Sequence, residues 1–204
     1  MDFVDLIELP TAIRPFSIDK PAIGISFGAE NYWAGQFVKK DGRAFVRILK
    51  IGGEGRYPLW NGIAFDGKTI HIGEAAKLQI AVKMHKKEPI NGAYRTKEFY
   101  GMNFDKVDRS SVPFPIVKDQ FNRIAIPVKE NNRTDLVSLE MINSVFIKSI
   151  ISDLESLFDI RNPYVVATEP DHADVMDVAL QYGILKIKNV NVDRLIFDSQ
   201  AAVL

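Results

Sequence analysis

The stretch Pro21–Gln36 reads PAIGISFGAENYWAGQ, and the interpretation of the whole chain depends on it. Ile23, Ile25 and Phe27 alternate with small or polar residues, which is the period of a β-strand. Gly28 follows directly, and a glycine lets the backbone turn with a positive φ or approach another group closely. The stretch therefore predicts a strand, a tight turn and a second strand that runs back along the first.

The residues up to position 72 continue this β pattern. Strands are predicted at 21–28, 32–39, 43–51, 59–65 and 69–72, with tight turns at Asp41-Gly42 and Asp66-Gly67. Short strands joined by tight turns predict an antiparallel meander. A helix is predicted at 73–84 from an apolar stripe at Ala75, Leu78, Ala81 and Val82.

The second half of the chain predicts alternating helices and strands. Its longest helix is expected at 139–158, capped by Ser138, with one apolar face made by Leu139, Ile142, Phe146, Ile150, Leu154 and Leu157. A hairpin is expected over 114–117 and 123–128, a polar loop at 130–135, strands at 163–168 and 190–197, and helices at 171–181, with Gly183 beyond its end, and 199–204. Alternation of this kind implies parallel strands with right-handed crossovers.

The composition is that of an ordinary soluble globular protein. The chain has 204 residues, with 26 Lys and Arg balanced by 26 Asp and Glu, so net charge indicates no partner. It has no cysteine, which excludes disulfides and thiolate chemistry. No apolar run approaches the roughly 20 residues of a membrane span, and the acidic start Met1–Asp5 lacks the basic residues of a targeting peptide. We therefore expect a cytoplasmic protein without membrane contact.

Five motifs, in order along the chain, resemble those of the 70-kDa heat-shock chaperone family. They are Ile23–Gly28 (IGISFG), His71–Lys77 (HIGEAAK), Thr96–Gly101 (TKEFYG), Val165–Pro170 (VVATEP) and Leu195–Ala202 (LIFDSQAA). They look like the family's Ile-Gly-Ile-Asp-Leu-Gly, Val-Gly-Glu-Pro-Ala-Lys, Ile-Lys-Arg-Leu-Ile-Gly, strand ending in Val-Pro, and Ile-Ile-Asn-Glu-Pro-Thr-Ala-Ala. Within the family, Ser26 and the run Phe99–Asp108 are most similar to the atypical, ribosome-associated members of the Ssz type.

The resemblance implies an α/β fold, the ribonuclease-H-like first lobe of an actin-like ATPase. Its antiparallel meander is extended by parallel strands, with helices on both faces. Residues 21–204 are expected to form this single lobe, and residues 1–20 an N-terminal arm. A lone lobe would expose an apolar sheet face, so we expect the arm's apolar residues to cover part of it or to dock on a partner. These residues are Phe3, Val4, Leu6, Ile7 and Leu9.

The first hairpin carries the family's phosphate site, and its chemical residues are replaced here. Where the family has an Asp that anchors Mg²⁺ and two Thr that touch phosphate, this chain has Ser26, Ala29 and Glu30. Serine does not neutralise Mg²⁺, alanine donates no hydrogen bond, and a glutamate repels polyphosphate. Gly28 alone is retained. The resemblance thus implies a degenerate nucleotide site, the alternative being an ordinary β-hairpin.

Two further residues match the family's chemistry. Lys97 stands at the position of the catalytic lysine, and Asp198 at that of a Glu near the metal. The simpler alternatives are a solvated surface lysine and a helix N-cap. We expect no resident cofactor, with ATP or ADP and Mg²⁺ as the alternative. No protein ligand set for a metal is expected, because His71, His85 and His172 lack ligand spacing.

These observations leave three functions open. The first is a non-catalytic heat-shock-70-like scaffold, partnered by a J-domain co-chaperone, a second heat-shock-70 protein or the ribosome. The second is a working ATPase lobe whose remainder lies beyond Leu204, with Lys97 in catalysis. The third is an RNA-associated protein that contacts rRNA through Lys83, Lys86 and Lys87, the alternative being a solvated basic surface.

Overall fold

The structure is a computed structural model that describes residues 6–8, 20–53, 55–67, 69–130, 133–187, 190 and 192–203. Most of the predicted arm, including Phe3, Val4 and Leu9, lies outside the described residues. Within it, Leu6–Glu8 forms strand β1, which pairs with the edge of the large sheet.

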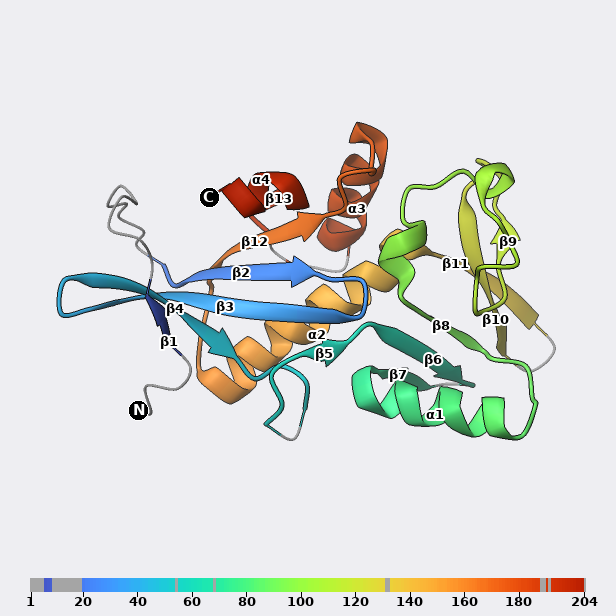
Figure 1. Cartoon of the computed structure of the whole chain (residues 1–204), viewed down its shortest axis with the longest axis horizontal. Helices are drawn as coiled ribbons and strands as arrows, with labels where there is room; N and C mark the ends of the chain where they lie inside the picture. Colours follow the sequence, from blue (N-terminus) through green and yellow to red (C-terminus); the bar gives the residue numbers. More distant parts are fainter. Residues whose placement is uncertain are drawn as a thin grey trace.

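The described chain is a mixed α/β structure with several sheets and four α-helices (Figure 1). The strands of the large sheet are β1 (Leu6–Glu8), β2 (Ala22–Phe27), β3 (Asn31–Lys40), β4 (Arg43–Leu49), β5 (Leu59–Trp60), β12 (Tyr164–Glu169) and β13 (Arg194–Phe197). Two smaller sheets contain β6 (Gly62–Asp66), β7 (Thr69–Ile72) and β8 (Gly92–Tyr94), and β9 (Val117–Lys118), β10 (Ile124–Glu130) and β11 (Arg133–Ser138). The helices are α1 (Gly73–His85), α2 (Leu139–Phe158), α3 (Val175–Ile187) and α4 (Asp198–Val203), with 3-10 turns η2 (Thr96–Phe99) and η3 (Phe104–Lys106).

The large sheet has the strand order β1-β4-β3-β2-β12-β13, with β5 added to β3. Its first part is antiparallel, as the meander predicted. The strands β2, β12 and β13 are parallel, which confirms the prediction drawn from the alternating second half. The register places Gly24 opposite both Gly35 and Val166.

The meander is shorter than the sequence predicted. The expected strand 59–65 is interrupted at Asn61, so Leu59 pairs with β3 while Ile63 belongs to a separate sheet. The polar loop expected at 130–135 was wrong, because Arg133–Ser138 pairs along its length with β10. The alternation of apolar and polar residues was too weak there to predict a strand, since every residue of β11 is exposed or half-buried.

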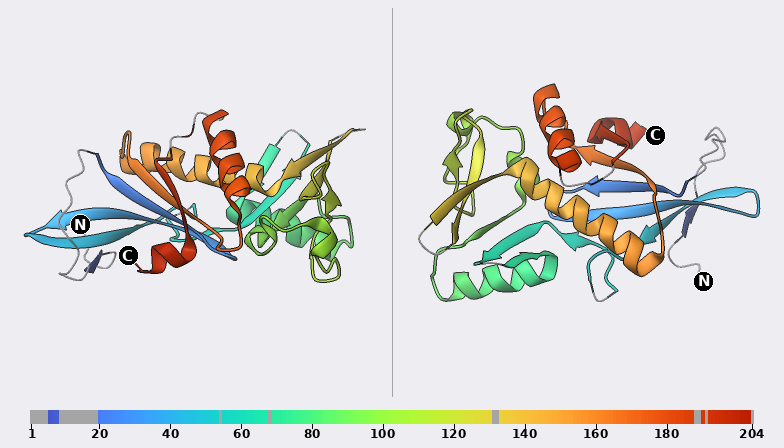
Figure 2. Two further views of the ribbon diagram at one scale, coloured as in Figure 1. Left: turned by 90° about the horizontal axis from the view of Figure 1, so that it is seen from above. Right: turned by 180° about the vertical axis from the view of Figure 1, so that it is seen from behind.

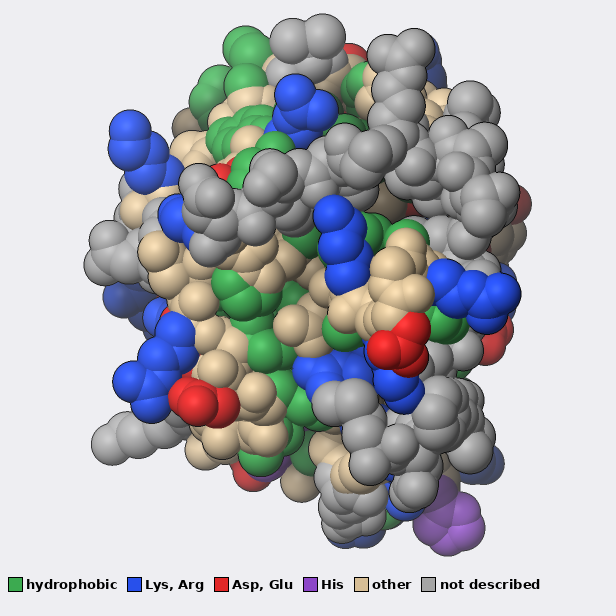
Figure 3. All heavy atoms as spheres, turned by 90° about the vertical axis from the view of Figure 1, so that its left-hand side faces the viewer, with side chains coloured by type: hydrophobic (Ala, Val, Ile, Leu, Met, Phe, Trp, Pro, Cys, Tyr) green, Lys and Arg blue, Asp and Glu red, His purple; other side chains and the backbone are tan. Residues whose placement is uncertain are grey.

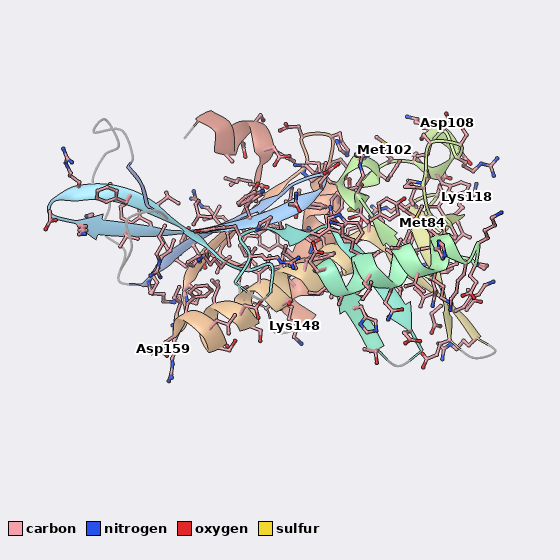
Figure 4. All side chains as sticks on the ribbon, turned by 60° about the horizontal axis from the view of Figure 1, so that its bottom comes forward. Met84, Met102, Asp108, Lys118, Lys148 and Asp159 are labelled. Atoms are coloured by element: carbon pink, nitrogen blue, oxygen red, sulfur yellow. The ribbon has the colours of Figure 1, made fainter. Side chains whose placement is uncertain are left out.

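The core lies between the large sheet and α2, whose predicted bounds and Ser138 cap are confirmed. The rings of Phe27 and Tyr32 stack at 4.9 Å between centroids, and Tyr32 stacks on Phe146 at 4.6 Å. The predicted apolar face of α2 is buried except for Leu157, which is 65% exposed. Lys148 and Asp159 lie on the outer side of α2 and at its end (Figure 4).

Two helix predictions need correction. The residues that α1 buries are Gly73, Ala76 and Ile80, whereas the predicted stripe faces outward, with Leu78 66% exposed. Both sides of this helix are apolar, so periodicity alone selected the wrong side. Helix α3 continues to Ile187, and Gly183 lies inside it, where no heavy atom outside its immediate neighbourhood approaches within 4 Å of an added Cβ.

The two faces of the large sheet are covered unequally. In Figure 2, α2 and α3 lie on one side of the sheet and the short α4 lies on the other. Figure 1 looks onto the second side, where no described helix lies in front of β2, β3 and β4. Helices therefore lie on both faces, as expected, but the helices that the structure describes leave one face largely uncovered.

Candidate functional site

The parallel strands end together at one edge of the large sheet. Strand β2 runs into Gly28, β12 into Pro170, and β13 into Asp198. In open α/β sheets, ligands bind outside the carboxyl ends of the strands. This edge is therefore the candidate site. It brings together Gly28, Lys97 and Asp198, which lie in separate motifs of the sequence.

Lys97 and Asp198 form an ion pair at this edge. Their side chains are only 19% and 28% exposed, respectively, and Lys97 Nζ lies 5.8 Å from the centroid of the Phe27 ring. The lysine is therefore not a free surface cation, and Asp198 is more than the predicted helix cap. The carboxylate of Asp198 thus neutralises the charge of the Lys97 ammonium group.

The turn after β2 is held by internal hydrogen bonds. The Gly28 amide donates to the Asn31 carbonyl at 3.0 Å, so it is not directed at a ligand. A Cβ on Gly28 would lie 2.3 Å from that carbonyl oxygen. Close approach, and not a positive φ, is thus the reason for glycine here. Glu30 is exposed, and Ala29 is half-buried.

Asn61, which the sequence did not single out, joins this turn to Lys97. Its fully buried amide donates to the carbonyls of Gly28 and Ala29, both at 3.1 Å, and its Oδ1 accepts from Thr96 Oγ1. Since Thr96 precedes Lys97, the amide fixes η2 against the hairpin. An asparagine that interrupts an apolar strand was the available sequence signal.

Ser26 lies apart from Lys97. Because Ile25 and Phe27 are buried on the α2 side, Ser26 points to the opposite face of the sheet. There it lines an open cavity together with Thr168, whose Oγ1 accepts a hydrogen bond from the Phe27 amide. The predicted degenerate site is therefore divided between two faces of the sheet.

A buried polar network lies beneath the candidate site. Tyr32 Oη donates to Asn143 Oδ1 at 2.8 Å, Tyr100 Oη donates to Gln181 Oε1 at 2.9 Å, and Gln181 Nε2 donates to Ser144 Oγ at 2.7 Å. Each of these side chains is essentially inaccessible to solvent. The polar pair Asn143-Ser144 within the apolar face of α2 was the signal for this network, and the sequence interpretation passed over it.

Glu169, the last residue of β12, is the acidic member of this network. It is fully buried, Asn143 Nδ2 donates to its Oε1 at 3.4 Å, and its Oε2 has no hydrogen-bond partner among the described residues. Burial raises the pKa of Glu169 to about 8 against the lowering effect of the nearby Tyr100 hydroxyl, and the charges of Glu140, Asp198 and Asp177 add to the increase.

Arg123 partly compensates the acidic groups. Its Nη1 lies 3.8 Å from Glu140 Oε1 and 3.4 Å from Asp177 Oδ1. Burial nevertheless raises the pKa of both carboxyls above their usual range.

The ends of β12 and β13 are linked by Asp171. The Ser199 amide donates to Asp171 Oδ1 at 3.0 Å. Hydrogen bonds from Ser199 lower the pKa of Asp171. Among the described residues, no group of three or more His, Cys, Asp or Glu side chains is placed to hold a metal ion.

The basic surface predicted to contact rRNA is partly neutralised. Lys83 Nζ lies 2.6 Å from Glu88 Oε2, and Lys77 pairs with Glu74. Lys86 and Lys87 are exposed at the end of α1. In the part of the chain that the structure describes, no helix is long and apolar enough to cross a membrane.

No protein-family model matches this chain, and no curated protein matches it.

Proposed function

We propose that this chain is a ribonuclease-H-like lobe related to the heat-shock-70 ATPases, and that it acts as a non-catalytic scaffold for a protein partner. The order β4-β3-β2-β12-β13, antiparallel and then parallel, supports the proposed lobe. The relation to the heat-shock-70 ATPases is supported by the resemblance of the five sequence motifs.

The ion pair between Lys97 and Asp198 carries the non-catalytic part of the proposal. Phosphoryl transfer needs a free cation at the γ-phosphate and donors aimed at phosphate oxygens. Here the cation is neutralised and the Gly28 amide is bonded within its own turn. Binding of ATP would have to break the ion pair and place polyphosphate beside Glu30.

Calorimetry of the full chain with Mg²⁺-ATP and Mg²⁺-ADP, together with a phosphate-release assay, tests this proposal. We expect no saturable heat and no release above background, in the native chain and in Lys97→Ala alike. Lys148→Ala, on the exposed side of α2, is the matched control. Saturable binding, with turnover that Lys97→Ala abolishes and Lys148→Ala preserves, would overturn the proposal in favour of a working ATPase lobe.

The partner classes proposed are a J-domain co-chaperone, a second heat-shock-70 protein and the ribosome. Titration with a purified J-domain or a heat-shock-70 protein, and co-sedimentation with ribosomes, distinguish them. We expect one of the three to bind without added nucleotide. Ribosome binding that disappears at high salt and on charge reversal of Lys83, Lys86 and Lys87 would instead support direct rRNA contact.

A further inference from the structure

The open face of the large sheet contains a groove along β2. The small residues Ala22, Gly24 and Ser26 form its floor. Trp33 and Phe37 of β3 form one wall, and Tyr164 and Val166 of β12, with Ala201 of α4 beyond them, form the other. The cavity has a volume of about 740 Å³.

This groove is unusual for the strands that form it. All-parallel sheets occur almost only with both faces covered, because their crossover connections place helices there, and this mixed sheet has a parallel part made by β2, β12 and β13. Strand β2 is paired on one side in parallel, yet Gly24 and Ser26 are exposed. The indole of Trp33 is 43% exposed beside them. Apolar surface of this kind, in the middle of a sheet, is typical of an interaction site.

The dimensions of the groove fit an α-helix. Strands β3 and β12 lie on either side of β2, so their backbones are two strand spacings apart, about 10 Å. A helix with its side chains is about 10–12 Å across, so a single helix lying along β2 would cover the sheet from β3 to β12. An added Cβ at Gly24 would meet no atom within 4 Å, so a helix backbone has room to approach the floor closely.

The charged residues around the groove select the partner. Alternation along the strands places Lys39 on the same face as Phe37, and Arg194 on the same face as Val166, with which it pairs. Both residues are exposed. Among the described residues of β2, β3, β4, β12 and β13, none of those that share this face is Asp or Glu. Figure 3 likewise shows more Lys and Arg than Asp and Glu among the described side chains at the sheet's left-hand end in Figure 1.

We propose that the groove along β2 binds an amphipathic helix of a protein partner, with a narrow apolar stripe on the floor and acidic residues along its edges. This inference rests on the proposed scaffold function and names the surface and the chemistry of its partner. The acidic edges would face Lys39 and Arg194, and the apolar stripe would cover Trp33.

The absence of cysteine makes a direct test straightforward. Ser26→Cys in the full chain, carrying a photo-crosslinking label, is exposed to a synthetic amphipathic helix with Glu edges. The matched control is Ser156→Cys, on the exposed side of α2 away from the groove. A second peptide has the same apolar stripe and Lys edges. We expect crosslinks to the Glu-edged helix from position 26 only.

Two variants test whether the groove floor and the basic residues at its edges contact the helix. Binding is measured by the fluorescence anisotropy of the labelled peptide. Gly24→Val, which fills the floor, should weaken binding about tenfold or more. Lys39→Glu combined with Arg194→Glu should weaken the Glu-edged helix and strengthen the Lys-edged one. Circular dichroism checks that each variant remains folded.

The proposal is overturned if both peptides crosslink equally, or if Gly24→Val folds and binds the Glu-edged helix unchanged. It is also overturned if position 26 crosslinks only to a second copy of the chain, with a dimer in sedimentation equilibrium. ATP turnover that depends on Lys97 would overturn the proposed function but would not contradict a positive peptide result. A negative peptide result with no turnover would overturn the groove assignment alone.

Discussion

One strand of the large sheet has two different environments. On the α2 side, Phe27 packs against Tyr32, which stacks in turn on Phe146. On the opposite side, the same strand presents Gly24 and Ser26 to solvent. The covered face contains the buried apolar core, whereas these β2 residues on the open face bury little surface. Side chains that do not have to be buried in the folded chain can contact a binding partner instead.

The largest expected effect tests the covered face. Phe146→Ala should lower the free energy of unfolding by about 3–5 kcal/mol, because it removes a fully buried ring and leaves a cavity. Urea denaturation measures this. Leu157→Ala, at an exposed position on the same helix, should change the free energy by less than about 1 kcal/mol. Equal losses would contradict the assignment of the core to one side of α2.

The second prediction concerns the acidic network under the site. The folded state keeps a proton on Glu169 up to about pH 8, whereas the unfolded chain loses it near 4.5. Unfolding therefore releases a proton in this window. The stabilisation that protonation provides is complete below the lower pKa and is lost as the pH rises towards 8. The slope cannot exceed about 1.4 kcal/mol per pH unit.

Glu169→Gln mimics the protonated side chain and should flatten this profile. We expect it to raise the free energy of unfolding at pH 8 and to change it little at pH 4, in urea titrations across the range. Glu155→Gln, at an exposed position on α2, is the control and should leave the slope unchanged. Persistence of the native slope in Glu169→Gln would assign it to Glu140 and Asp177, whose pKa values are also raised.

The third prediction concerns the connection between the hairpin and Lys97. Asn61→Ala removes three side-chain hydrogen bonds from a fully buried position. At about 1 kcal/mol for each bond, the free energy of unfolding should fall by about 3 kcal/mol. Gln120→Ala, at an exposed position, serves as the control for urea denaturation. A loss below about 1 kcal/mol would show that Asn61 does not hold η2 in place.

The strands and the helix of the covered face were largely predictable from the sequence. The contacts between the residues of the candidate site were not. Alternation identified β2, and the spacing of Leu139, Ile142 and Phe146 identified α2, because one-sided burial leaves a periodic pattern. Helix α1 is apolar on both sides although only one side is buried, and burial is weak along β11, so the pattern of apolar residues was misleading there.

The site depends on contacts that no local pattern reports. Lys97 and Asp198 are about a hundred positions apart, and only the parallel pairing of β12 with β2 and β13 brings the strand ends together. Asn61 and Glu169 act through side-chain hydrogen bonds to distant residues. For these residues, spacing in the sequence contains no information about their partners.

The smallest expected effect comes from two glycine substitutions, one in β2 at Gly24 and one in the turn after it at Gly28. An added Cβ at Gly24 meets no atom within 4 Å, while at Gly28 it would lie 2.3 Å from the Asn31 carbonyl oxygen. Gly24→Ala should therefore stabilise the free chain by about 0.5 kcal/mol, since alanine reduces the freedom of the unfolded state. Gly28→Ala should destabilise it, because backbone must move. Thermal unfolding of the two variants decides the point, and a loss at Gly24 would mean that the groove floor is already occupied in the free protein.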